Sequence, residues 1–116
     1  MGEPRTILVV DDEADIRDSL RDALEDEGYT VLVAANGRDA LAQLPRLKPP
    51  CAIILDIIMP VMNGVDFYAT MQADPRYADV PVIVSTSDAS RAPSGVFIMK
   101  KPLRVDRLLS ALTKLC

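Results

Sequence analysis

Five short apolar runs recur along the chain and predict the strands of a buried sheet. They span residues 7–10, 30–34, 52–55, 82–86 and 96–99. The run 52–55, which Pro49 and Pro50 precede, is continuous rather than alternating, as is typical of a strand covered on both faces of a parallel sheet. The pattern therefore favours a sheet with helices packed on each side.

Apolar residues at helical spacing follow four of these runs. In the first such segment Ile16, Leu20 and Leu24 share one face, which predicts an amphipathic helix that ends at Gly28. The other three segments begin after Asn36-Gly37, after Gly64 and near Val105. Because parallel strands need right-handed crossovers that place helices on both faces, this alternation predicts a doubly wound α/β fold.

The segment between the fourth and fifth runs departs from the pattern. It comprises the nine residues 87–95 and has no apolar helical period. A crossover that contains a helix usually needs at least about 10–12 residues. We therefore predict that the fourth helix of the fold is absent or much shortened.

Composition limits the organisation of the chain and its partners. A length of 116 residues fits one domain, so we expect residues 1–116 to fold as a single unit without an output domain. The composition, 49% hydrophobic and 26% charged, is that of a globular protein. A net charge of -4 without clustered Lys and Arg argues against binding to nucleic acid or to an anionic membrane.

The chain shows no sign of export or of a membrane anchor. No signal peptide is evident, and no run approaches the roughly 18 apolar residues of a membrane span. Cys51 and Cys116 lack metal-ligand spacing, and two reduced cysteines are a simpler interpretation than a disulfide framework. We therefore expect a cytoplasmic protein.

Acidic residues follow two of the predicted strands. Asp11 and Asp12 follow the first strand, and Asp56 follows the third. Open α/β sheets bind ligands at the carboxyl ends of their strands, so the three carboxylates are expected to converge there. Converging carboxylates repel unless a cation or a shifted pKa relieves them. Oxygen ligation of this kind is typical of Mg²⁺, which commonly completes its shell with a phosphate.

Two further strand ends offer groups that suit a phosphoryl site. Thr86 offers a hydroxyl and Lys101 an ammonium, which with a metal would neutralise a phosphoryl group in transfer to a carboxylate. Each assignment has an alternative. Asp11, Asp12 and Glu13 could cap the following helix. Thr86 lies in a run of hydroxyl residues typical of turns, and Lys100 competes with Lys101.

With these residues in place, the chain resembles the receiver domain of two-component response regulators. The residues that carry the resemblance are Asp11-Asp12, Asp56 with Met59-Pro60 and Gly64, Thr86, and Lys101-Pro102. The resemblance covers essentially the whole chain and implies a flavodoxin-like sheet in the strand order 2-1-3-4-5. It also implies a signalling domain rather than an enzyme, with self-catalysed phosphotransfer and dephosphorylation only.

The resemblance assigns a role to each site residue. Asp56 would accept a phosphoryl group from a partner's phosphohistidine. Asp12, Asp56 and the backbone carbonyl of Ile58 would hold Mg²⁺ directly, and Asp11 would hold it through water. Of the remaining site residues, Lys101 would contact the phosphoryl oxygens, Thr86 would report phosphorylation, and Lys101-Pro102 would be a cis peptide.

The resemblance also implies partners. A sensor histidine kinase or a histidine phosphotransfer protein would supply the phosphoryl group, since this chain has no histidine. Such a donor would dock on the first helix and on the loop after the fifth strand. The candidate docking residues are Ala14, Asp15, Ile16, Ser19, Leu20, Leu103 and Arg104. The downstream protein target stays open.

Output and function class leave alternatives. Receivers usually carry an aromatic residue at the switch position three residues before the lysine, where this chain has Ile98. Ordering of residues 87–95 on phosphorylation is one route of output, and a role as a phosphate sink or shuttle is the other. A pseudo-receiver that binds partners without phosphorylation and a small Mg²⁺-dependent phosphohydrolase are the alternative functions.

Overall fold

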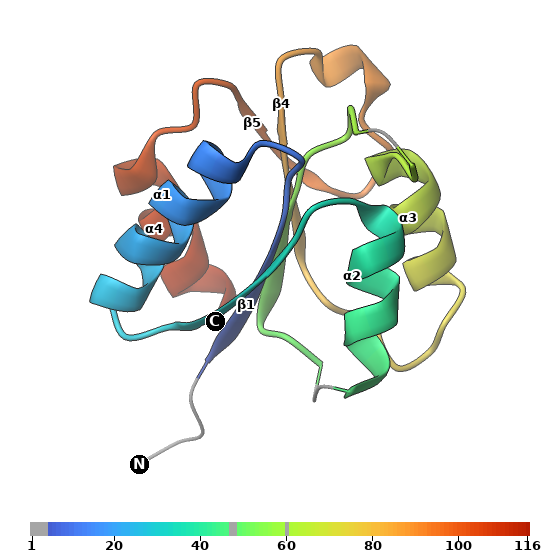
Figure 1. Ribbon diagram of the computed structural model, residues 1–116, viewed down its shortest axis with the longest axis horizontal. Helices are drawn as coiled ribbons and strands as arrows, with labels where there is room; N and C mark the ends of the chain where they lie inside the picture. The colour runs from blue at the N-terminus through green and yellow to red at the C-terminus, as the bar shows by residue number, and fades with distance from the viewer. Residues whose placement is uncertain (1–4, 47–48, 60) are drawn as a thin grey trace.

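The computed structural model describes residues 5–46, 49–59 and 61–116, so Pro60 of the predicted Met59-Pro60 pair lies outside the described residues. The chain forms a five-stranded sheet in the order β2-β1-β3-β4-β5 with every pairing parallel (Figure 1). The strands are β1 (Thr6–Val10), β2 (Thr30–Ala34), β3 (Ala52–Leu55), β4 (Val82–Thr86) and β5 (Phe97–Lys100). The predicted sheet and its strand order are confirmed.

Helices cover both faces of the sheet. One layer contains α1 (Ala14–Asp26) and α4 (Val105–Leu115), and the other contains α2 (Gly37–Gln43) and α3 (Gly64–Gln72) (Figure 1). A 3₁₀ turn, η1 (Leu44–Arg46), follows α2 and contains Pro45, which lacks the N–H that a continuing helix would need. No helix in the described ranges is long and apolar enough to cross a membrane.

The core divides into two clusters because successive strand residues point to opposite faces of the sheet. Leu8 and Val10 of β1 belong to the cluster beneath α2 and α3, whereas Ile7 and Val9 belong to the cluster beneath α1 and α4. These β1 residues are fully buried. The continuous apolar pattern of the inner strands is thereby explained.

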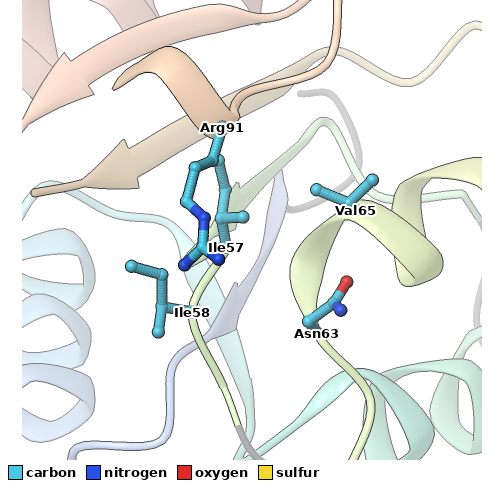
Figure 2. Close-up of a pocket in the computed structure, with 5 residues that line it drawn as sticks. All are labelled: Ile57, Ile58, Asn63, Val65 and Arg91. Carbon is cyan, nitrogen blue, oxygen red and sulfur yellow. The ribbon is translucent and has the colours of Figure 1, made fainter. Parts of the chain in front are cut away.

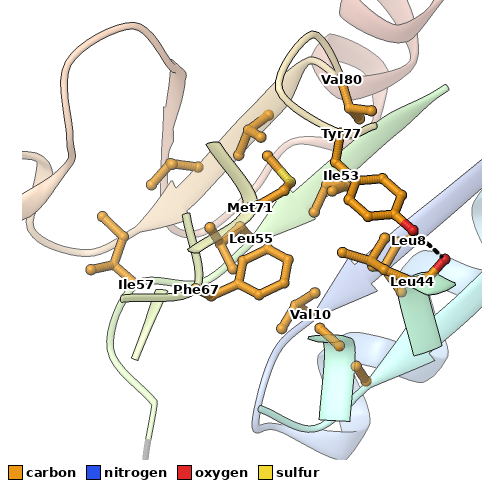
Figure 3. Close-up of a cluster of buried hydrophobic side chains, with 14 of the residues drawn as sticks. Leu8, Val10, Leu44, Ile53, Leu55, Ile57, Phe67, Met71, Tyr77 and Val80 are labelled. Atoms are coloured by element: carbon orange, nitrogen blue, oxygen red, sulfur yellow. Dashed lines mark hydrogen bonds between the residues drawn. The ribbon is translucent and has the colours of Figure 1, made fainter. Parts of the chain in front are cut away.

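Aromatic residues complete the cluster beneath α2 and α3. Phe67 and Met71 of α3 are buried there with Leu55 of β3 (Figure 3). The hydroxyl of buried Tyr77 donates a 3.0 Å hydrogen bond to the backbone carbonyl of Leu44. This bond offsets the cost of burying a polar group in an apolar cluster.

The fourth helix is predicted to be absent or much shortened, and its absence is not borne out. The described residues contain four α-helices, and the segment between β4 and β5 forms a short 3₁₀ helix, η2 (Ala89–Arg91). Asp88 precedes η2, and its side chain accepts a 3.1 Å hydrogen bond from the backbone N–H of Ser90. Capping by polar side chains starts this turn without any apolar period, which is why the hydrophobic pattern did not reveal it.

The prediction of two reduced cysteines is wrong, because Cys51 and Cys116 form a disulfide. Their Cα atoms are 5.7 Å apart, a separation that suits a bridge. Cys51 precedes β3, Cys116 follows α4, and both pack against the same core cluster. The bridge ties the end of α4 to the start of a central strand. Because the two cysteines are 65 positions apart in sequence, their proximity depends on the packing of α4.

Candidate functional site

Three acids converge where β1 and β3 end. Val10 pairs with Leu55 in the sheet, so the residues that follow them, Asp11 and Asp56, leave adjacent strands side by side. Carboxylate oxygens of Asp11, Asp12 and Asp56 all lie within 4.8 Å of one another. Asp11 is 3% exposed and Asp56 is 5% exposed, whereas Asp12 is exposed. Burial next to like charge makes this cluster costly unless a cation balances it.

Lys101 supplies part of that balance. Its Nζ lies 3.3 Å from Oδ2 of Asp11 and 3.2 Å from Oδ2 of Asp56. The strand pairing explains this position, because the backbone N–H of Lys101 donates a 2.9 Å hydrogen bond to the carbonyl of Thr86 at the end of β4. The Lys101–Pro102 peptide bond is cis. The structure therefore places Lys101, and not its neighbour Lys100, against the acids.

The electrostatics of the cluster oppose ionisation of Asp56. Burial raises the pKa of the Asp56 carboxyl and the charge of Asp11 raises it further, while Lys101 and the N–H of Ile58 offset only part of this. Burial alone would lower the pKa of the Lys101 ammonium, but the charges of Asp11 and Asp56 and its hydrogen bonds to them raise it above its ordinary value. Lys101 thus stays cationic beside a carboxylate whose charge is incompletely balanced.

The acidic ends of the strands have local hydrogen bonds as well. Oδ1 of Asp56 accepts a 3.1 Å hydrogen bond from the N–H of Ile58, and Oδ1 of Asp11 accepts a 2.9 Å bond from the N–H of Glu13. Glu13 is the N-cap residue of α1, yet its side chain makes no cap hydrogen bond within the described part of the chain. The helix-capping alternative is therefore realised only through Asp11, which bonds the backbone N–H at the helix start.

Replacement of Asp56 by Asn is expected to raise the melting temperature at neutral pH in the presence of a chelator. A carboxyl whose pKa is raised in the folded state contributes stability fully below its unfolded-state pKa, near 3.9, and loses that contribution as the pH rises through the folded-state pKa. Asn does not ionise, so the variant does not lose stability in this way as the pH rises. Thermal melts of both proteins from about pH 4 to neutral pH measure the effect. A difference that does not grow with pH would contradict it.

The hydroxyl of Thr86 forms its hydrogen bonds with Asp88 and not with the acids. Thr86 is fully buried. Its Oγ1 accepts a 3.1 Å hydrogen bond from the N–H of Asp88 and donates a 3.3 Å hydrogen bond to the carbonyl oxygen of the same residue. The Thr86 hydroxyl thus stabilises a turn, as the run of hydroxyl residues suggested. Ile98, at the expected switch position, is 47% exposed, and Phe97 next to it is 54% exposed.

Six of the seven candidate docking residues line one of two surface pockets, and Ala14 lines neither of the two. One pocket of about 290 Å³ lies between α1 and the segment after β5. Its lining includes Asp15, Ile16, Ser19, Leu20 and Leu103. Arg104 instead lines a different pocket with Ile98 and Arg107. The structure therefore joins the α1 residues with Leu103 in one surface and sets Arg104 apart from it.

Two arginines near the acids had no signal in the sequence. Arg17 of α1 donates a 2.7 Å hydrogen bond from Nη1 to the backbone carbonyl of Asp11. Arg91 of η2 lines a pocket with Ile57 and Ile58, the residues that follow Asp56 (Figure 2). Neither arginine belongs to a motif, and each reaches the site through the fold.

The cluster has the chemistry of a metal site. Its three carboxylates offer oxygen ligands within a few ångströms, and burial and the charge of Asp11 raise the pKa of Asp56 in spite of the nearby Lys101. Hard divalent cations prefer oxygen ligands of this kind. The acidic triad can therefore hold a metal ion, with an ammonium beside it for an anionic ligand.

Comparison with known protein families places this site in context. Residues 7–113 match the family described as the response regulator receiver domain. Response regulator Rre1 of Synechocystis is 38% identical over 88 residues, which cover 75% of this chain and 38% of Rre1. This chain spans less than two thirds of such curated relatives, 63% in the case of a Leptolyngbya boryana protein.

Solved structures agree in fold over nearly the full length. Chemotaxis protein CheY4 of Vibrio cholerae superimposes with a TM-score of 0.88 at 29% identity, covering 98% of this chain and 100% of that one. Response regulator TrrA of Thermotoga maritima, solved in complex with Mg²⁺-BeF, has a TM-score of 0.84 at 29% identity, covering 97% of this chain and 99% of that one. The acidic triad of this chain thus lies in a fold with experimentally determined relatives.

Proposed function

The chain belongs to the response regulator receiver domain family, and from this premise we propose that Asp56 accepts a phosphoryl group from the phosphohistidine of a partner protein. Receiver domains are phosphoacceptor signalling modules rather than conventional enzymes. The observation that carries the proposal is the buried Asp56 carboxylate within a cluster of three acids, with Nζ of Lys101 at 3.2 Å. The donor is a sensor histidine kinase or a histidine phosphotransfer protein.

The acids would hold Mg²⁺. We assign direct contacts to Asp12, Asp56 and the backbone carbonyl of Ile58, and a water-mediated contact to Asp11. Bound there, the ion would neutralise charge on the phosphoryl oxygens. The close oxygen atoms of the triad and the incompletely balanced charge of Asp56 support this assignment.

The side chains of the site divide the remaining work. A carboxylate oxygen of Asp56 is the nucleophile that attacks phosphorus. Lys101, held cationic by the acids, donates hydrogen bonds to the phosphoryl oxygens and stabilises their charge. Thr86 would exchange its hydrogen bonds to Asp88 for one to the phosphoryl group. That exchange would change the hydrogen bonds at the start of η2 and couple the site to residues 87–95.

The donor would dock on the surface formed by α1 and Leu103. Apolar Ile16 and Leu103 line this pocket next to Lys101, so a helical partner seated there would present its histidine near Asp56. Asp15 and Ser19 would give the contact its polar specificity. Arg104 lies on another pocket and would contribute at the rim of a larger interface.

Incubation with acetyl phosphate tests the proposal directly. With Mg²⁺ present, the intact mass of the protein is expected to rise by one phosphoryl group, because acetyl phosphate can replace the protein donor. Excess chelator is expected to suppress the gain, since the desolvated acids then lack the cation that neutralises the phosphoryl oxygens. An undiminished gain in chelator would contradict the metal assignment, and the lack of any gain in either condition would contradict the phosphoacceptor function.

A further inference from the structure

A pocket of about 330 Å³ continues from the chain segment that follows Asp56 (Figure 2). Its lining residues are Ile57, Ile58, Asn63, Val65 and Arg91. The segment after β3 forms one part of the wall, the start of α3 forms a second part, and η2 contributes Arg91. The pocket is therefore built from the loops that surround the acidic cluster.

The lining has one full charge, the guanidinium of Arg91. Figure 2 shows the Arg91 side chain extending from η2 toward Ile57 and Ile58, with Val65 and Asn63 on the other side. Among the residues that the structure describes, no carboxylate forms an ion pair with Arg91 within 4.0 Å. Hydrogen bonds from Ser90 lower the pKa of the Asp88 carboxyl and the charge of Arg91 lowers it slightly further, but Asp88 forms no ion pair with Arg91, so the guanidinium can still bind an anion that enters the pocket.

The rest of the lining is largely apolar. Ile58 is 45% exposed and Val65 is 37% exposed, although both are branched aliphatic residues. Oδ1 of Asn63 is occupied, because it accepts a 2.9 Å hydrogen bond from the N–H of Asp66. A ligand that fits here has a short apolar part and an anionic end, and small-molecule sites commonly combine such features.

We propose that this pocket binds the acyl end of a small acyl phosphate and that Arg91 stabilises the carboxylate that leaves during phosphorylation of Asp56. The inference rests on the proposed phosphoacceptor function and assigns to it a site for the leaving group of a small-molecule donor. The apolar part of the acyl group packs on Ile58 and Val65. The guanidinium faces the acyl oxygens, to which its two parallel N–H groups are well matched.

The reaction produces a new negative charge on the leaving group. An oxygen of Asp56 forms a bond to phosphorus while the bond between phosphorus and the acyl oxygen breaks. The electron pair of the breaking bond stays on the acyl oxygen, which leaves in a carboxylate anion, and no proton is transferred. Because attacking and leaving oxygens lie roughly in line, the leaving group points away from Asp56.

The negative charge on the leaving acyl oxygen grows between the ground state and the transition state. An interaction that strengthens with it lowers the barrier instead of only tightening donor binding. Arg91 is exposed, so water screens its charge and the expected effect is moderate. A loss of about tenfold in rate, rather than the 10²–10³ typical of a buried oxyanion donor, is expected when the charge is removed.

Comparison of two donors tests the inference in the variant Arg91→Gln. Acetyl phosphate leaves as an anionic carboxylate, whereas phosphoramidate leaves as neutral ammonia and places no such charge in the pocket. The rate of phosphorylation by acetyl phosphate is expected to fall about tenfold, and the rate with phosphoramidate is expected to stay within about twofold. Arg91→Lys, which keeps the charge but loses the paired N–H groups, is expected to recover part of the acetyl phosphate rate.

Arg107→Gln is the matched control, because Arg107 is also exposed but lines a different pocket. It is expected to leave both rates unchanged. An equal fall with both donors in Arg91→Gln, or no fall with either, would overturn the inference, as would an equal loss in the Arg107 variant. Failure of the wild-type protein to react with either donor would instead refute the phosphoacceptor function itself.

Discussion

Replacement of Asp56 by Asn is expected to abolish the incorporation of a phosphoryl group, measured as intact mass after incubation with acetyl phosphate and Mg²⁺. The amide of Asn is not a competent nucleophile, so no acyl phosphate bond can form at this position. Asp11 and Asp12, which we assign to Mg²⁺, are not expected to replace it. Asn is nearly isosteric with Asp and preserves the packing around the site.

Asp66→Asn is the matched control, since Asp66 is an exposed acid in the first turn of α3. Its variant is expected to incorporate the phosphoryl group at the wild-type level. The raised pKa of Asp56 predicts that Asp56→Asn is the more stable protein at neutral pH, so a thermal melt of the variant separates loss of the nucleophile from unfolding. Survival of a full mass gain in Asp56→Asn would refute the assignment of the phosphoacceptor.

The strand ends were predictable because they depend on local pattern. Continuous apolar runs identified the inner strands, and parallel strands bring their carboxyl ends to one edge whatever the details of packing. Adjacent pairing of Val10 with Leu55 then places Asp11 beside Asp56. The convergence of the acids followed from sequence for this reason.

Other features depend on contacts between distant segments and could not be predicted in that way. Arg91 reaches the pocket near Asp56 only because η2 folds over the segment that follows β3. The disulfide of Cys51 with Cys116 depends on how α4 packs against the sheet. The 3₁₀ turn η2 begins with hydrogen bonds of Asp88, which an apolar pattern does not record.

The side-chain direction of Thr86 is a further example. The sequence placed a hydroxyl at the end of β4, and the strand does end there. A threonine hydroxyl, however, bonds whichever neighbour its rotamer reaches, and in this structure that neighbour is Asp88. Residue type and position were therefore predictable, whereas the hydrogen-bond partner was not.

At Gly64, close backbone contacts leave no room for a side chain. A Cβ atom at this position would lie 2.5 Å from the carbonyl oxygen of Asp56 and 2.7 Å from the Cα of Ile57. Both are backbone atoms of the segment that follows β3, so neither can move aside as a flexible side chain would. The N–H of Gly64 also donates a 2.8 Å hydrogen bond to the carbonyl of Ile57, which holds the two segments together.

Gly64→Ala is therefore expected to lower the free energy of unfolding by about 3 kcal/mol, the upper part of the usual range for overpacking. For a domain of this size that corresponds to a fall of roughly 10 °C in melting temperature. Gly37→Ala is the comparison variant, because the nearest atom to its Cβ is the movable Cγ of Met62 at 2.8 Å and the nearest backbone atom, the Met62 oxygen, is farther away at 3.0 Å than the two nearest backbone atoms at Gly64. Alanine also favours the helix at this position.

The free energy of unfolding of Gly37→Ala is expected to differ from the wild-type value by no more than about 1 kcal/mol. Urea denaturation of both variants measures the difference. At temperatures where Gly64→Ala remains folded, its phosphorylation by acetyl phosphate is also expected to slow, since relief of the clash must displace the backbone that carries the Asp56 carboxylate. A Gly64→Ala protein with wild-type stability and rate would show that the segment after β3 yields freely, and that close packing against α3 does not position Asp56.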